Sequence, residues 1–335
     1  MTDFTPIKAN VIFIGLGAMG LPMAKNVMAR LADGFTLSVI DKNERALAAA
    51  TQAGAVALGD TPKGVAASKD DVVITMLPND AVLETVLNDP ERGLLTSVTG
   101  GFPGIHISCS TIHPDTSRRL AQTHKYVGAP VFARADGVAN RDASIVVGTN
   151  DASLIEQVRP ILDAMAKGVF VFSETDAGAG NVVKLCGNFM IAAAIESCAE
   201  AAALADCQGL DRVQVMEMLT STIFDCLIYR GYGMRTAHRQ HIVGQPLVGP
   251  GFALNLGYKD VSLARSVAAA AQQPMPTASL LQDRFLASMA KGRSGMDWSA
   301  VALLTAEEAG RDVSEWLPDD KITEDGPATK KSRTE

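Results

Sequence analysis

Residues 11–20 read Val-Ile-Phe-Ile-Gly-Leu-Gly-Ala-Met-Gly, and this stretch decides the fold. Four apolar residues of the kind found in buried parallel strands lead directly into three glycines. Gly15 permits a tight turn, Gly17 lets a ligand approach the backbone, and Gly20 lets the following helix pack closely on the strand. A pyrophosphate would lie at the N-terminus of that helix, where free N–H groups favour negative charge. We therefore predict a dinucleotide-binding turn, with a purely structural glycine turn as the alternative. Its cofactor-binding residues would be Gly15, Gly17, Ala18, Met19 and Gly20.

Strand-like and helical segments alternate through the first half of the chain. Strands are expected at residues 10–14, 35–40, 71–76 and 104–109, and helices at 21–30 and 43–53. This alternation predicts a parallel sheet with helices on both faces. Further strands are expected at residues 126–131, 144–147 and 169–172, where they would complete the same domain.

From Asp176 onward the sequence is almost purely helical in character. Asp176 can cap a helix N-terminus, and residues 181–207 are rich in alanine. At about 1.5 Å per residue, such a helix is roughly 40 Å long and can run from one domain into another. We predict an α/β fold with a Rossmann-type domain joined by this helix to an all-α domain. The expected divisions are residues 1–175, 176–207 and 208–318, followed by a disordered polar tail at 319–335.

Composition narrows the class of protein. The 335 residues carry a net charge of -7, which argues against nucleic acid as the main partner. Five cysteines at irregular spacing indicate neither a disulfide scaffold nor a zinc site, and they favour a reducing compartment. The N-terminus does not resemble a signal peptide, and no uninterrupted apolar run approaches ~20 residues. We expect a cytoplasmic protein with no metal, no membrane partner and no nucleic-acid partner.

Asp41 ends the second expected strand, at about the distance that a dinucleotide-binding fingerprint requires. Its carboxylate would bind the adenosine ribose 2′-hydroxyl and repel a 2′-phosphate, which favours NAD over NADP. Lys42 would offset part of that repulsion, so NADP remains possible. The alternative is that Asp41 caps the helix that begins near Asn43.

The start of the long helix carries a second candidate site. Lys184 and Asn188 are four residues apart, so their side chains share one helix face. Gly178 and Gly180 before them would let another molecule, such as a nicotinamide, approach the backbone. A lysine on a helix is usually a solvated surface charge, so this pattern alone does not define a site.

Four motifs follow one another between about residues 10 and 290. They are Gly15 to Asn26, Ala129-Pro-Val131, Gly178-x-Gly-x-x-x-Lys184-x-x-x-Asn188, and Lys259-Asp-Val261. In this order they resemble the motifs of the β-hydroxyacid dehydrogenase family. That family includes 3-hydroxyisobutyrate dehydrogenase and tartronate semialdehyde reductase, and it is related to 6-phosphogluconate dehydrogenase.

The resemblance implies an NAD(P)-dependent oxidoreductase that interconverts a small 3-hydroxy acid and its semialdehyde or oxo acid by hydride transfer. It also implies homodimers or homotetramers. Lys184 would be the catalytic lysine, Asn188 would help to hold the substrate, and Lys259 would close over the nicotinamide end. Positions that line the cofactor would be Leu77, Pro78 and Thr111. A lysine with a pKa lowered by burial or a nearby cation can act as the base in oxidation and as the acid in reduction.

One loop departs from the family pattern. Where the typical family loop reads Pro-Val-Ser-Gly-Gly, this chain has Phe132-Ala-Arg134 after Pro-Val. Phe132 removes a hydroxyl that would bind the substrate carboxylate and adds bulk. Arg134 either binds a carboxylate itself or points to solvent. We predict both as substrate-binding positions and leave the substrate open. An imine reductase and a non-catalytic dinucleotide-binding scaffold are the alternative functions, and the retained Lys184 argues against both.

Overall fold

The computed structural model describes residues 6–62, 65, 68–95, 102–241 and 251–317. The chain forms two compact units. Unit 1 comprises Met1–Ala193 and Leu256–Gln282, and unit 2 comprises Ala194–Asn255 and Asp283–Glu335. One boundary between them falls inside the long helix α7 (Ala179–Cys207). The domain limits given above remain a prediction, and the expected tail at 319–335 lies outside the described residues.

Within its described residues, unit 1 is built on one nine-stranded sheet with the order β3-β2-β1-β4-β5-β6-β8-β7, and β9 pairs with β8. Strands β1 to β6 pair in parallel, whereas β8 runs antiparallel to β6 and β7 and parallel to β9. The strands are β1 Val11–Ile14, β2 Leu37–Ile40, β3 Val56–Ala57, β4 Val72–Thr75, β5 Ile105–Ser108, β6 Lys125–Gly128, β7 Val131–Phe132, β8 Ser144–Thr149 and β9 Gly168–Ser173. The predicted strands are confirmed, except that the one expected at residues 126–131 is divided into β6 and β7.

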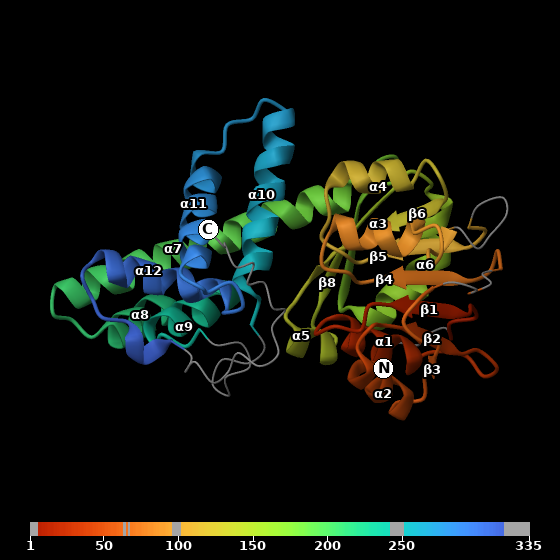
Figure 1. Ribbon diagram of the computed structural model, residues 1–335, viewed down its shortest axis with the longest axis horizontal. Helices are drawn as coiled ribbons and strands as arrows, with labels where there is room; N and C mark the ends of the chain where they lie inside the picture. Colours follow the sequence, from red (N-terminus) through yellow and green to blue (C-terminus); the bar gives the residue numbers. More distant parts are fainter. Residues whose placement is uncertain (1–5, 63–64, 66–67, 96–101, 242–250, 318–335) are drawn as a thin grey trace, which may run out of the picture. The chain divides into compact units, whose positions relative to one another are not determined.

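Helices cover both faces of the sheet, as Figure 1 shows with α3 and α4 on one side and α1 and α2 on the other. They are α1 Gly20–Met28, α2 Glu44–Gln52, α3 Asp80–Asn88, α4 Pro114–Leu120, α5 Ala135–Ala139 and α6 Ser153–Met165. The alternation of side chains along β1 explains this arrangement. Val11 and Phe13 join the core with α1 and α6, whereas Ile12 and Ile14 join the core with α3 and α4. The side chains on both faces of β1 are apolar, which fits a sheet that helices cover on both sides.

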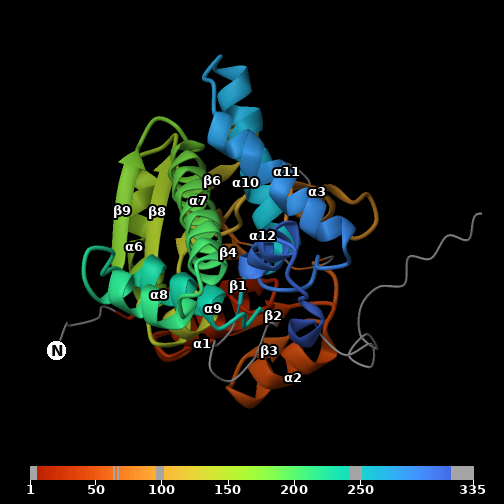
Figure 2. The same ribbon diagram turned by 90° about the vertical axis from the view of Figure 1, so that its left-hand side faces the viewer.

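The described part of unit 2 consists of helices and turns. It contains the end of α7, α8 Arg212–Ser221, α9 Met234–Ala237, the end of α11 (Pro276–Ala290) and α12 Val301–Glu308, with a π-helical turn at Tyr229–Gly233. Helices α7, α8 and α9 pack together through Cys198, Ala202, Met216 and Ala237 (Figure 2). A fully buried ion pair of 2.7 Å in unit 2 joins Arg235 on α9 to Asp297.

Helix α7 is long and apolar enough to cross a membrane by length and composition, with a mean hydropathy of 1.4. Half of its most apolar window is buried inside the protein. A long core helix has the same composition, and α7 carries Lys184 and Asn188 buried within unit 1. The helix therefore gives only weak evidence of a membrane span.

Candidate active site

The glycine-rich turn lies between the carboxyl ends of β1 and β4. Gly15 has a φ of +95°, and a side chain there would collide with the carbonyl oxygen of Met76. A side chain at Gly20 would collide with the Gly15 carbonyl, so both glycines are needed for the turn itself. Gly17 is exposed, and no atom lies within 4 Å of the space that its side chain would fill. The open backbone at Gly17 is what a bound phosphate requires.

The N-terminus of α1 offers the polarity that a pyrophosphate needs. This helix has no side-chain N-cap and no acidic residue in its first turn. Its first N–H groups and its dipole therefore favour an anion. The turn and the helix together fit a dinucleotide.

Asp41 lies beside this turn. Its Oδ2 accepts a hydrogen bond from Leu16 N at 2.5 Å, and its Oδ1 accepts one from Asn43 N at 2.7 Å. The N-cap of α2 is Asn43, whose side chain accepts from Arg45 N and Ala46 N. The alternative that Asp41 caps α2 is therefore wrong, and the carboxylate is held next to the end of β1.

The segments that follow β4 and β5 lie at the same carboxyl-terminal edge of the sheet as the glycine-rich turn. Leu77 N donates a hydrogen bond to the buried Ser110 Oγ at 2.8 Å, and Pro78 beside it is exposed. The Thr111 carbonyl accepts a hydrogen bond from Lys259 Nζ at 2.6 Å. In doubly wound sheets, ligands bind outside the carboxyl ends of the strands, where the strand order reverses. The predicted cofactor-lining positions thus lie at the sheet edge at which doubly wound folds bind their ligands.

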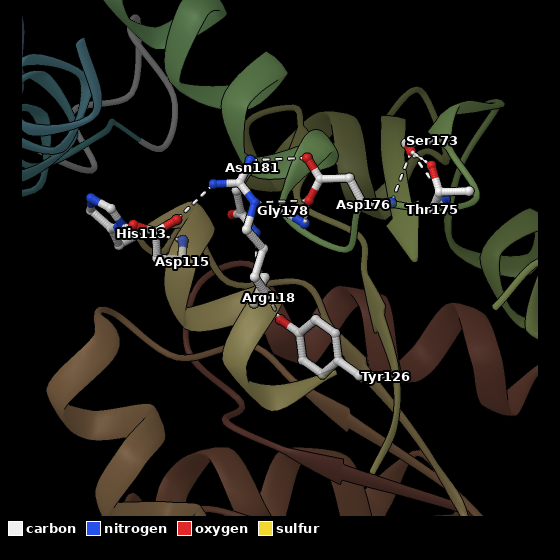
Figure 3. Close-up of polar contacts among 10 residues, drawn as sticks. His113, Asp115, Arg118, Tyr126, Ser173, Thr175, Asp176, Gly178 and Asn181 are labelled. Atoms are coloured by element: carbon white, nitrogen blue, oxygen red, sulfur yellow. Dashed lines mark hydrogen bonds and ion pairs between the residues drawn. The ribbon is translucent and has the colours of Figure 1, made fainter. Parts of the chain in front are cut away.

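A group of polar side chains fixes the start of α7, as Figure 3 shows. Asp176 accepts a hydrogen bond from Gly178 N at 2.9 Å, directly before the first residue of α7, and whether Asp176 caps the helix stays a prediction. The Arg118 guanidinium on α4 donates two hydrogen bonds of 2.9 Å to the same carboxylate, and one to Asp115. The bonds from Arg118 lower the pKa of Asp176. The bidentate geometry joins α4 to the first turn of α7.

Asn181 joins the same helix to the segment that follows β5. Its Oδ1 accepts a hydrogen bond from Ile112 N at 3.3 Å, and its Nδ2 donates to Ser117 Oγ at 2.8 Å. Ser117 is in turn hydrogen-bonded to Tyr126 Oη at 2.9 Å. Asn181 is fully buried, and sequence reasoning missed it. Asn181 lies one turn before Lys184 on the same helix face, and this spacing could have identified it as part of the site.

The glycines at the start of α7 have a role different from the predicted one. A side chain at Gly180 would lie 2.6 Å from the Val146 carbonyl oxygen on β8, and one at Gly178 would lie 2.8 Å from the Pro114 carbonyl oxygen. These positions are filled by the protein's own backbone. The glycines therefore let α7 pack closely on unit 1, and their approach to a nicotinamide stays a prediction.

Lys184 is buried rather than solvated, with 9% of its surface exposed. Burial lowers its pKa to about 8, the carboxylate of Asp260 raises the pKa, and the ammonium of Lys259 lowers it further. The Phe132 ring lies with its centroid 4.2 Å from Lys184 Nζ. A lysine in these surroundings is present in both protonation states near neutral pH.

Asp260 connects the remaining predicted residues. Asn188 Nδ2 donates a hydrogen bond to Asp260 Oδ2 at 2.5 Å, and Lys259 Nζ lies 3.0 Å from Asp260 Oδ1. Residues 259 and 260 belong to α10 (Leu254–Ala270), in the part assigned to unit 1. The tertiary structure therefore brings together Lys184, Asn188, Lys259 and Thr111, and adds Asp260 as a residue that the sequence analysis gave no role.

Arg134 was predicted to bind the substrate, but it lies apart from Lys184, Asn188 and Asp260 in the contacts that the described residues make. Its guanidinium lies 3.6 Å from Asp136, and its side chain is 36% exposed. It precedes α5 without capping it through its side chain. No contact between Arg134 and Lys184 or Asn188 is seen in the part of unit 1 that the structure describes.

Fold and site together define a dinucleotide-dependent oxidoreductase with a buried lysine as its acid–base candidate. Two family models cover most of the chain. Residues 10–174 match the NAD binding domain of 6-phosphogluconate dehydrogenase, and residues 178–305 match the NAD-binding domain of NADP-dependent 3-hydroxyisobutyrate dehydrogenase.

Individual proteins match over nearly the same extent. The 2-(hydroxymethyl)glutarate dehydrogenase of Eubacterium barkeri is 31% identical over 90% of this chain and 96% of its own. The 3-sulfolactaldehyde reductase of Escherichia coli is 31% identical over 90% of this chain and 97% of its own. A solved structure of the Mycobacterium tuberculosis 3-hydroxyisobutyrate dehydrogenase has 27% identity and a TM-score of 0.71, and the match covers 88% of this chain and 98% of that one.

The chain belongs to the β-hydroxyacid dehydrogenase family. It is an NAD(P)-dependent oxidoreductase with the Rossmann-type domain, long helix and helical C-terminal part that the sequence predicted.

Proposed function

We propose that this enzyme interconverts a small 3-hydroxy acid and its semialdehyde or oxo acid, with Lys184 as the general acid and base. The observation that supports this is the buried Lys184, with a pKa of about 8 and with Asn188 one turn further on the same helix. A general acid–base group works best when its pKa lies near the working pH. A buried lysine whose pKa is lowered by desolvation and by a neighbouring cation is a candidate for such a role.

In the oxidative direction, neutral Lys184 accepts the proton of the substrate hydroxyl as the C–H bond breaks. In the reductive direction, the Lys184 ammonium returns that proton to the carbonyl oxygen. Nicotinamide supplies or accepts the hydride when it is bound. Burial serves both directions, because a desolvated ammonium gives up its proton more readily than one in water.

Asp260 and Lys259 set the conditions under which Lys184 works. Asp260 stabilises the charged lysine and holds the Asn188 amide, which leaves the Asn188 Oδ1 and one N–H for the substrate. Lys259 opposes the charge on Lys184 and anchors to the Thr111 carbonyl. We assign Asn188 to substrate binding and Lys259 to the nicotinamide end of the site.

The cofactor assignments follow from the edge formed by β1, β4 and β5. Gly17, Ala18 and Met19 would hold the pyrophosphate, and Gly15 and Gly20 would shape the turn. Leu77, Pro78 and Thr111 would line the dinucleotide. Asp41 would bind the adenosine ribose and favour NAD, since its carboxylate is held beside the turn by Leu16 N.

The substrate is a small hydroxy acid, consistent with the hydroxy acid and aldehyde substrates in the names of the two relatives. Arg134 is our candidate for the substrate carboxylate, and Phe132 lies against Lys184. We also propose a homodimer or homotetramer in the cytoplasm, on the resemblance to the family.

The test is a pair of lysine variants and a substrate panel. Lys184→Ala should lose at least ~100-fold in turnover, the low end for general acid–base catalysis, while NAD still binds. Cys186→Ala, at an exposed position of the same helix, is the matched control. Unchanged turnover in Lys184→Ala would remove Lys184 from the mechanism.

The panel contains 3-hydroxy acids, semialdehydes and cyclic imines, and is followed through the absorbance of the reduced cofactor. Turnover confined to the imines would favour an imine reductase. Silence throughout, with cofactor bound, would favour the non-catalytic scaffold.

A further inference from the structure

The Phe132 ring stands against the nitrogen that we assign to proton transfer. Phe132 ends β7, where it pairs with Ser144 of β8, and Lys184 comes from α7. The distance of 4.2 Å from Lys184 Nζ to the ring centroid lies within the range of a cation–π contact. The ring is therefore one wall of the space in which a substrate hydroxyl must meet Lys184.

Gly187 makes room for that ring. It lies three residues after Lys184, so it shares the same face of α7. A side-chain carbon at Gly187 would lie 2.5 Å from Cζ of Phe132, closer than real side-chain contacts allow. No larger residue fits at 187 unless the ring moves. Phe132 and Gly187 thus form one packing unit beside Lys184.

We propose that Phe132 is the positioning residue for Lys184 and the specificity-determining wall of the substrate site, with Gly187 as its seat. The role given to Lys184 here rests on the proposed function. The serine of the family pattern would bind the substrate carboxylate at this place, whereas the ring offers an apolar face. With Arg134 as our candidate for the carboxylate, Phe132 faces the substituent on carbon 2 of the substrate. The substrate is then a 3-hydroxy acid that presents a hydrocarbon group, rather than a hydroxyl or an amine, to Phe132.

The ring acts on Lys184 in two opposing ways. It excludes water, which disfavours the charged form, and its π-face attracts the ammonium, which favours it. Phe132→Ser removes both effects, whereas Phe132→Leu keeps the exclusion of water and removes only the π-face. The two variants therefore separate burial from the aromatic contact.

The first experiment measures the pKa of Lys184 without any turnover. Acetic anhydride is added in trace amounts across a range of pH, and the labelling of Lys184 is followed by peptide mass spectrometry. Phe132→Ser should raise the pKa of Lys184 from about 8 toward its ordinary value of 10.5, whereas Phe132→Leu should leave the pKa at about 8 or below. Equal midpoints in wild type and both variants would overturn the positioning role. Lack of turnover in the separate substrate panel, in wild type and variants alike, would count against the proposed function and would leave this labelling result to decide the positioning role.

The second experiment tests the pairing with Gly187. Gly187→Ala should displace the ring in the wild type and change the labelling of Lys184, but it should add little once Phe132→Ser has removed the ring. A Gly187→Ala protein that fails to fold while the double variant folds would report the same clash. Additive effects of the two changes would contradict the pairing. Cys186→Ala serves as control, since it alters an exposed side chain of the same helix.

The third experiment tests the substrate class. The probes are 3-hydroxy-2-methylpropanoate and 2,3-dihydroxypropanoate, which differ by a methyl or a hydroxyl group on carbon 2. Wild type should favour the methyl compound, and Phe132→Ser should shift the ratio of the two kcat/KM values toward the diol by about tenfold or more. An unchanged ratio would overturn the specificity role.

Discussion

Asn188 donates a hydrogen bond of 2.5 Å to Asp260, which lies 72 residues further along the chain. This bond holds the Asn188 amide, and the same carboxylate pairs with Lys259 and raises the pKa of Lys184. One buried acid therefore couples the predicted substrate amide, the predicted nicotinamide-side lysine and the predicted general base. Its effects on Lys184 and on Asn188 can be measured separately.

Changes at Asp260 and Lys259 should move the pH profile of oxidation in opposite directions. Oxidation needs neutral Lys184, so its rate should rise with pH through about 8. Asp260→Asn removes the charge that favours the ammonium, so this rise should move to lower pH. Lys259→Met removes the charge that opposes the ammonium, so the rise should move to higher pH. Profiles of kcat against pH check both, and shifts of equal sign would contradict the assignment.

Asp41 should set the choice of cofactor. Asp41→Ala removes the ribose acceptor and the charge that repels a 2′-phosphate, so the ratio of kcat/KM for NADP to that for NAD should rise by about tenfold or more, the scale of one lost hydrogen bond to a charged group. Glu44→Ala, at an exposed position in the first turn of α2, is a suitable control. No change in the ratio would dismiss the ribose assignment.

Asn181 should be needed for stability and for cofactor binding together. Asn181→Ala leaves the buried Ile112 N without its partner and removes one of the two hydrogen bonds of Ser117 Oγ, at a cost of about 1–3 kcal/mol. The Tm should fall by several degrees, and NAD should bind more weakly because Ile112 adjoins Thr111. Asn88→Ala, at an exposed position of α3, should change neither. Thermal unfolding and NAD titration check this prediction, which a normal Tm and a normal NAD affinity would refute.

Two stacked histidines should make unit 1 sensitive to acid. His106 is fully buried, with Nε2 2.9 Å from Thr75 Oγ1 and Nδ1 3.1 Å from His124 Nε2. Burial lowers the pKa of both, to about 4 for His124 and well below 6.5 for His106. The unfolded chain takes up protons first as the pH falls, so stability is complete above about 6.5 and declines toward 4.

The His124→Gln variant isolates one part of this effect. The decline of Tm between pH 6.5 and pH 4.5 should be shallower in this variant than in wild type, since one buried titrating group is gone. Differential scanning calorimetry at closely spaced pH values provides the measurement. Parallel curves for the two proteins would show that His124 does not contribute.

The sequence by itself determined most of the strands and the glycine-rich turn. Residues 11–20 predict a strand, a turn and a helix because each property is local. The strand β1 is buried because its side chains are apolar. The turn needs glycine at positions 15 and 20 because it has no room for a side chain at either. The same holds for Asp176, whose carboxylate accepts a hydrogen bond from the N–H of Gly178, two residues further along the chain. Such features depend largely on neighbours within one turn of chain, which the sequence displays directly. The contact of Gly15 with the Met76 carbonyl is the part that the fold adds.

Only the tertiary structure decided the environment of Lys184. Whether that lysine is solvated or buried depends on Phe132 from β7 and on Asp260 from α10, which are far from it in the chain. The same is true of Gly178 and Gly180, whose neighbours are carbonyl groups of other elements. Desolvation and charge act through space, so a pKa is set by what folding brings near. The sequence thus identified the lysine, and the fold gives it the surroundings of a proton donor and acceptor.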